Sequence, residues 1–174
     1  SLNWYLFNFF FICFYQMGLI FLFSLPILSA WEGGGELTYI DFIVGGLMLS
    51  LIVIQTIADE QQHKYQTKKY SLINANKVLE GHFKKGFIDT GLCKYSRHPN
   101  YFGDSLFWWG ITIYCFALSN NLLIFIAPII MTYLLLRVSG VTMLENRLSK
   151  KKDGYTEYIN STSSFIILPK KKSK

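Results

Sequence analysis

The chain has 174 residues, of which 51% are hydrophobic and only 16% are charged. A soluble domain of this size carries about 25% charged residues, so the composition excludes an ordinary soluble domain. The net charge of +6 does not indicate nucleic-acid binding. All seventeen Lys and Arg fall within residues 64–97 and 137–174, beside apolar runs, as expected for basic residues that flank membrane spans.

The first apolar run, about residues 4–28, contains no formal charge and is long enough to cross about 30 Å of hydrocarbon. The connection after it is acidic and holds no basic residue. A second span is predicted for about residues 38–58, and its Gly45-Gly46 pair predicts close helix packing. Because the chain begins directly in apolar sequence, we predict that it is part of a larger helical bundle.

A polar loop is predicted for residues 59–98. At the end of the second span, Gln55, Asp59 and Gln62 share one helical stripe. The stripe suits either a binding site or a helix that surfaces into water, and both interpretations stay open. The histidines at positions 63, 82 and 98 do not have metal-ligand spacing, which predicts that no metal site is present.

The change from basic loop to apolar helix occurs at Pro99, which suits the first turn of a helix. Asn100 and Asp104 then lie one turn apart on one face. Lys94 and Arg97 precede the helix start, and cations beside a helix N-terminus predict a site for a phosphate-bearing ligand. Basic residues here are also a topology signal, but an acid inside an apolar helix usually marks a site.

Two further spans are predicted for about residues 99–118 and 122–137, followed by a tail over residues 138–174. The predicted fold is all-α, a polytopic membrane helix bundle with four transmembrane helices in a single domain. The positive-inside bias places the loop, the tail and both termini in the cytosol. Lys171 and Lys172 are the fourth and third residues counted from the end of the sequence, which matches a dilysine retrieval signal of the endoplasmic reticulum.

The motif Tyr-Ser-Arg-His-Pro-Asn-Tyr-Phe-Gly-Asp at residues 95–104, preceded by Ala58-Asp59, resembles the C-terminal half of the steroid 5-alpha reductase superfamily. The tail motif with Glu145 and Tyr155 does so too, and the resemblance covers nearly the whole chain. It implies a membrane enzyme that reduces a carbon–carbon double bond of a lipid-like substrate (steroid, sterol, polyprenol or enoyl lipid) with hydride from NADPH. The motifs predict twelve cofactor-binding residues: Gln55, Asp59, Lys94, Tyr95, Arg97, His98, Asn100, Tyr101, Asp104, Glu145, Tyr155 and Tyr158.

Two departures from the family pattern limit what the resemblance implies. Asp104 stands where the family usually has Glu, and full-length relatives carry additional N-terminal helices whose groups polarise the substrate carbonyl. No catalytic residue is therefore assigned. The expected partners are the lipid-like substrate and membrane lipids, without nucleic acid or metal.

Two alternatives to the reductase remain. Isoprenylcysteine and phospholipid methyltransferases of the membrane share an R-H-P-x-Y-x-G pattern and bind S-adenosylmethionine instead of NADPH. Asn100, Phe102 and the acid at position 104 favour the reductase. The third class is a non-enzymatic membrane relative that retains the fold.

Overall fold

The computed structural model describes residues 2–33, 35–138 and 140–171, and over these residues it contains helices and no strand. A single isolated bridge joins Ser96 to Ser163. The all-α prediction is therefore confirmed. The helices are α1 (Leu2–Phe7), which continues through a π-helical segment (Asn8–Tyr15) into α2 (Gln16–Ala30), then α3 (Tyr39–Asn74), α4 (Gly81–Lys85), α5 (Pro99–Ser119), α6 (Ile126–Tyr133), α7 (Val141–Lys151) and α8 (Tyr155–Ser161).

Three helical stretches are long and apolar enough to cross a membrane, namely Leu2–Ala30, Tyr39–Asn74 and Leu122–Lys151. The predicted count of four spans is not confirmed. α5 is 21 residues long, but its first two turns carry Asn100 and Asp104, which make it less apolar than the most apolar part of each of these stretches.

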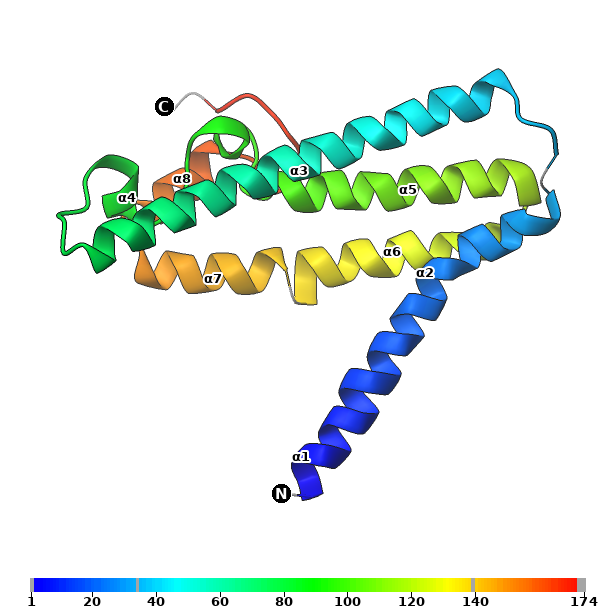
Figure 1. The fold of residues 1–174 in the computed structure, drawn as a ribbon, viewed down its shortest axis with the longest axis horizontal. Coiled ribbons are helices and arrows are strands. Elements are labelled where there is room, and N and C mark those ends of the chain that lie inside the picture. The colour runs from blue at the N-terminus through cyan, green and yellow to red at the C-terminus, as the bar shows by residue number, and fades with distance from the viewer. Residues whose placement is uncertain (1, 34, 139, 172–174) are drawn as a thin grey trace.

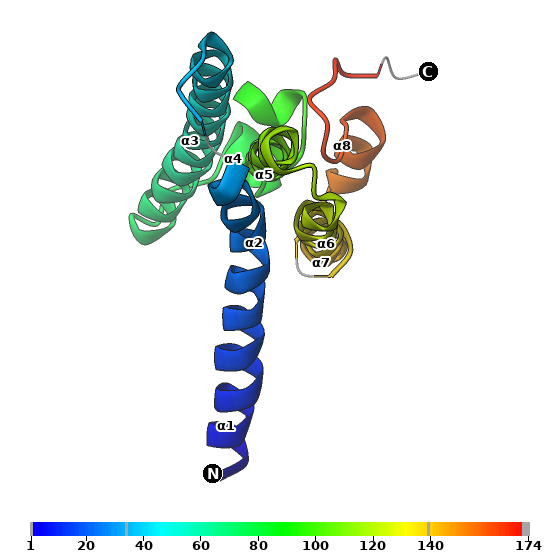
Figure 2. The same ribbon diagram turned by 90° about the vertical axis from the view of Figure 1, so that its right-hand side faces the viewer.

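α3 and α5 form the central pair of the bundle and lie side by side (Figures 1 and 2). α6 runs along the other side of α5, and α7 continues its direction (Figure 1). α2 contacts α5 and α6 near the end of the bundle that holds the first connection, whereas α1 projects away from the bundle. The segment between α4 and α5 and the C-terminal tail lie at the opposite, Lys-rich end.

α3 is much longer than the predicted span, because it continues through 36 residues to Asn74. The prediction of a loop beginning at residue 59 is therefore wrong. No Gly or Pro occurs in residues 59–74, and Lys64 pairs with Glu60 one turn earlier at 3.0 Å, as helix-stabilising i,i+4 pairs do. The last turns of α3 thus extend beyond the apolar part and form one wall of the Lys-rich end.

Two other predictions concern the Gly45-Gly46 pair and the dilysine pattern. Gly45 and Gly46 face open space, so the expected close packing at this pair does not occur. The close approach is at Gly103 of α5, where an added Cβ would lie 2.7 Å from Cγ of Gln55. The dilysine pattern includes residues 172–174, which lie outside the described residues.

Replacing Gly103 by Val should separate α3 from α5. The two added methyl groups meet the Gln55 side chain, and overpacking of this kind costs about 1–3 kcal/mol. We expect Gly103→Val to lower the Tm in detergent by several degrees, measured by the loss of helical circular dichroism.

Gly46→Val is the matched control, because it adds the same side chain to a helical glycine with no described atom within 4 Å. Its Tm should equal that of the wild type or exceed it slightly, since Val is a better helix former than Gly. Equal Tm losses in the two variants would show that Gly103 is not a packing contact.

Candidate functional site

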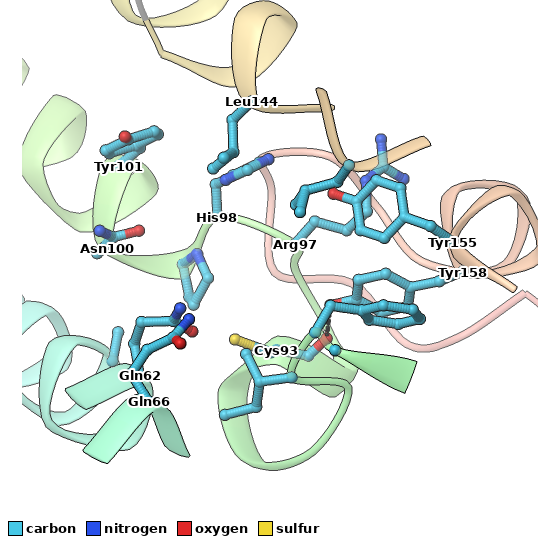
Figure 3. A pocket seen from close by; sticks show the side chains of 16 residues that line it. Gln62, Gln66, Cys93, Arg97, His98, Asn100, Tyr101, Leu144, Tyr155 and Tyr158 are labelled. Carbon is cyan, nitrogen blue, oxygen red and sulfur yellow. Dashed lines mark hydrogen bonds between the residues drawn. The ribbon is translucent and has the colours of Figure 1, made fainter. Parts of the chain in front are cut away.

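A cavity of about 270 Å³ lies at the Lys-rich end of the bundle (Figure 3). It is enclosed by α3, by the segment that leads into α5, and by α7 and α8. This volume is at the lower limit of pockets that hold small molecules. The lining residues are Ala58, Gln62, Gln66, Gly86, Phe87, Ile88, Cys93, Arg97, His98, Pro99, Asn100, Tyr101, Leu144, Leu148, Tyr155 and Tyr158.

Arg97 is the most heavily bonded side chain of the cavity wall. Its Nε donates to Oε1 of Glu145 at 2.8 Å and its Nη2 to Oε2 at 3.1 Å, which is the bidentate geometry that only Arg can supply. Its Nη1 donates to the carbonyls of Ile159 and Thr162 at the end of α8. Four of the five N–H groups are thereby used, and one Nη2 proton is left for a ligand.

The same segment binds the C-terminal tail through its backbone. The N–H of Arg97 donates to the carbonyl of Ser163 at 2.9 Å, and Leu168 donates to the carbonyl of Tyr95 at 3.2 Å. Ser96 is completely buried and its hydroxyl donates to the carbonyl of Phe165 at 2.7 Å. The residues that follow α8 therefore run beside the loop just ahead of α5.

His98 connects helix α7 to the first turn of α5. Its Nε2 lies 3.1 Å from Oε1 of Glu145, and its ring stacks on Tyr101 with the centroids 5.5 Å apart. Only 5% of its surface is exposed. Glu145 thus fixes both Arg97 and His98. Its own carboxylate lies behind these two side chains as seen from the cavity, which it does not line.

Two polar pairs join α3 to α5 beside the cavity. Nδ2 of Asn100 donates to Oδ1 of Asp59 at 3.1 Å. One turn later in α5 and one turn earlier in α3, Nε2 of Gln55 donates to Oδ1 of Asp104 at 3.4 Å. The predicted faces of the two helices therefore meet, and the acid inside α5 has a partner, as buried charges require.

Aromatic rings form the wall opposite α3 (Figure 3). Phe87 packs against Tyr155 and Tyr158 with ring centroids 5.0 and 5.2 Å away. Burial, with a smaller contribution from the charge of Glu145, raises the pKa of Tyr155 to about 12. Tyr158 donates to the carbonyl of Cys93, and burial raises its pKa too.

Both tyrosines are therefore neutral at physiological pH. Burial and the nearby Asp89 likewise raise the pKa of the Cys93 thiol to about 11, so it is a weak nucleophile. The hydroxyl of Tyr155 points toward the cavity (Figure 3), and among the described residues none forms a hydrogen bond with it. A neutral hydroxyl in this position can donate to a bound ligand.

Six of the twelve predicted residues line the cavity, and four more lie directly behind it. Asp59 and Glu145 bond to lining residues, and Gln55 and Asp104 form the adjacent pair. Lys94 and Tyr95 lie elsewhere: they are exposed, and Nζ of Lys94 lies over the ring of Tyr95 at 5.8 Å. The six lining residues are Arg97, His98, Asn100, Tyr101, Tyr155 and Tyr158.

The twelve predicted cofactor-binding residues did not include Gln62, which was named only on the helical stripe, or Gln66; the amides of both face the cavity from α3 (Figure 3). A usable signal was present, because Gln55, Asp59, Gln62 and Gln66 follow one another at the i, i+4, i+7 and i+11 spacing of a helical stripe. Within the described ranges, no three His, Cys, Asp or Glu side chains are grouped as metal ligands.

Comparisons with known proteins identify a matching family and a relative, and neither description states an activity. Residues 1–162 match the family described as protein of unknown function (DUF1295). An uncharacterized protein of Schizosaccharomyces pombe is 30% identical over 127 residues, which are 68% of this chain and 37% of the relative. The chain thus spans much less than two thirds of that relative's length. No solved structure matches.

Neutralising Glu145 should release the tail. Glu145→Gln leaves the buried guanidinium of Arg97 without its counter-charge, and breaking a buried pair in this way costs about 3 kcal/mol. We expect a lower Tm in detergent and faster chymotrypsin cleavage after Tyr155, Tyr158 or Phe165, followed by mass spectrometry.

Glu157→Gln is the control, because Glu157 lies exposed on α8 and its loss removes the same charge. It should leave both the Tm and the cleavage rate at wild-type values. We call the Arg97–Glu145 pair the clamp. Its role in holding the tail is refuted if Glu145→Gln resists cleavage as well as Glu157→Gln does.

Proposed function

The chain belongs to the DUF1295 family, and we propose that it is a membrane oxidoreductase that reduces a carbon–carbon double bond of a lipid-like substrate with hydride from NADPH. The supporting observation is that motif residues distant in sequence, namely Asp59, Arg97, Asn100, Glu145 and Tyr155, lie in or directly behind one cavity. This arrangement agrees with the resemblance of the motifs to the steroid 5-alpha reductase superfamily.

In this proposal each part of the cavity has a binding role. Asn100 and the amides of Gln62 and Gln66 offer donors and acceptors for the ribose or the carboxamide of the cofactor. Tyr155 offers a neutral donor, and the remaining Nη2 proton of Arg97 offers one charged contact. NADPH supplies the hydride when it is bound, and the protein contributes orientation.

The proposal extends to the membrane arrangement. α5 acts as a fourth span, shielded by α3 and α6, and its polar first turns lie at the membrane surface. The Lys-rich end and both termini face the cytosol in accordance with the positive-inside rule, and the membrane is that of the endoplasmic reticulum. Substrate polarisation is left to additional helices, as the length of the matched relative allows.

A second candidate is an S-adenosylmethionine-dependent methyltransferase of the isoprenylcysteine or phospholipid type. It is favoured by the small volume of the cavity, about 270 Å³, and by the use of four Arg97 N–H groups within the protein. A cofactor without phosphate groups needs less room and fewer cations than NADPH does.

Titration of the purified protein with each cofactor separates the candidates. A ligand that binds the folded state at 100 times its Kd stabilises it by about 2.7 kcal/mol, which is readily detected as a rise in Tm. We expect NADPH to raise the Tm and S-adenosylmethionine to leave it unchanged. The reverse result would transfer the assignment to the methyltransferase, and no shift with either would favour a non-enzymatic role.

Asn100→Ala should weaken NADPH binding about fivefold, because it removes a hydrogen-bonding group worth about 1 kcal/mol. The measurement is the Kd from NADPH fluorescence. Asn160→Ala is the control, since Asn160 lies exposed on α8 and should bind NADPH as the wild type does. An unchanged Kd in Asn100→Ala would contradict the assignment of this residue.

A further inference from the structure

A second cavity, of about 400 Å³, lies between the last turns of α3 and the short helix α4. We refer to it as the α3–α4 cavity. It opens on a different face of α3 from the site described above, because it uses Gln61, Lys64, Tyr65 and Lys68 where the first cavity uses Ala58, Gln62 and Gln66. The remaining lining residues are His82, Phe83, Ile88, Thr90 and Gly91, of which only Ile88 is shared.

The floor of the α3–α4 cavity is an aromatic stack. Tyr65 is 5% exposed and lies parallel to Phe83, with centroids 5.4 Å apart and 13° between the planes. The ring of His82 is 4.3 Å from that of Phe83. The hydroxyl of Tyr65 donates to the carbonyl of His82 at 3.1 Å, so this tyrosine holds α4 in place and presents only its ring.

Positive charge surrounds this floor. Lys64 and Lys68 are successive residues of one helical face, and Nζ of Lys68 lies 5.7 Å from the centroid of Phe83. None of the nine lining residues is acidic. Of the nearby acids, Glu60 pairs with Lys64 at the exposed rim, and Asp89 is occupied by Lys85 at 2.6 Å. Thr90 and the imidazole of His82 add hydrogen-bond donors.

The depth of the cavity relative to a membrane follows from helix geometry. α5 has 21 residues, which at about 1.5 Å per residue span about 31 Å and match a hydrocarbon layer of about 30 Å. Its first turn is level with Asp59, to which Asn100 bonds. Lys64 then lies about 7.5 Å and Lys68 about 13 Å beyond this level. The headgroup layer is about 5–7 Å thick, so the backbone of Lys64 stands at its outer edge and that of Lys68 about 6 Å beyond it. Long side chains of a helix point back toward its N-terminus, which directs both ammonium groups toward the headgroup layer.

We propose that the α3–α4 cavity binds the phosphate group of an anionic membrane lipid. The two lysines would contact the phosphate, and the aromatic floor would contact the C–H groups of the glycerol backbone below it. Charged groups of soluble phosphate compounds share this chemistry, but the depth of the cavity favours a lipid headgroup. The proposal does not depend on the identity of the cofactor in the first cavity.

The test compares Lys64→Gln/Lys68→Gln with the wild type in nanodiscs of phosphatidylcholine to which phosphatidylglycerol is added stepwise. We expect phosphatidylglycerol to raise the Tm of the wild type. The double variant should need at least tenfold more of this lipid for the same rise, because each lysine near a membrane surface contributes about fivefold to the binding of anionic lipid.

Lys150→Gln/Lys151→Gln is the matched control, because it removes two exposed lysines from α7, which also lies at the Lys-rich end. It should respond to phosphatidylglycerol as the wild type does. The proposal is overturned if both double variants lose the response equally, which indicates general charge attraction. It is also overturned if glycerol 3-phosphate in solution reproduces the shift in phosphatidylcholine alone, which indicates a soluble ligand.

Discussion

The buried pair of Arg97 and Glu145 is the interaction on which the Lys-rich end of the molecule depends. It acts together with the packing of Tyr155 and Tyr158 on Phe87 and with the backbone bonds of residues 163 and 168 to the segment before α5. A bidentate pair with two further carbonyl acceptors offsets the cost of removing two charges from water. The cavity exists because this pair holds the end of α8 in place, so that Tyr155 and Tyr158 form the wall opposite α3.

A second constraint is the register of α3 against α5. Gly103 lets the helices approach, and the approach brings Asn100 to Asp59 and Asp104 to Gln55. Each pair forms in one alignment of the two helices, so these pairs fix the register as well as the polarity of the site. The clamp and the register together decide which side chains face the cavity.

The sequence predicted the polar faces of α3 and α5, because period-3.6 spacing is visible in the chain itself. It did not predict the role of Arg97 as a clamp, since its partner is Glu145, 48 residues away. A motif shows that an arginine stands before a helix but not whether its donors face a ligand or the protein. The extension of α3 to Asn74 was not predicted, because the polar composition of residues 59–74 was interpreted as a loop. These residues contain no Gly or Pro that would end the helix.

A double-mutant cycle on the clamp tests the account most directly. The free energy of unfolding of the wild type, Arg97→Gln, Glu145→Gln and the double variant would be measured in mixed dodecyl maltoside and SDS micelles. The account predicts a coupling energy of about 2 kcal/mol between the two positions, as expected of side chains in one network. Single losses that add to within about 0.5 kcal/mol would contradict it, because they would show that the two residues stabilise the protein independently.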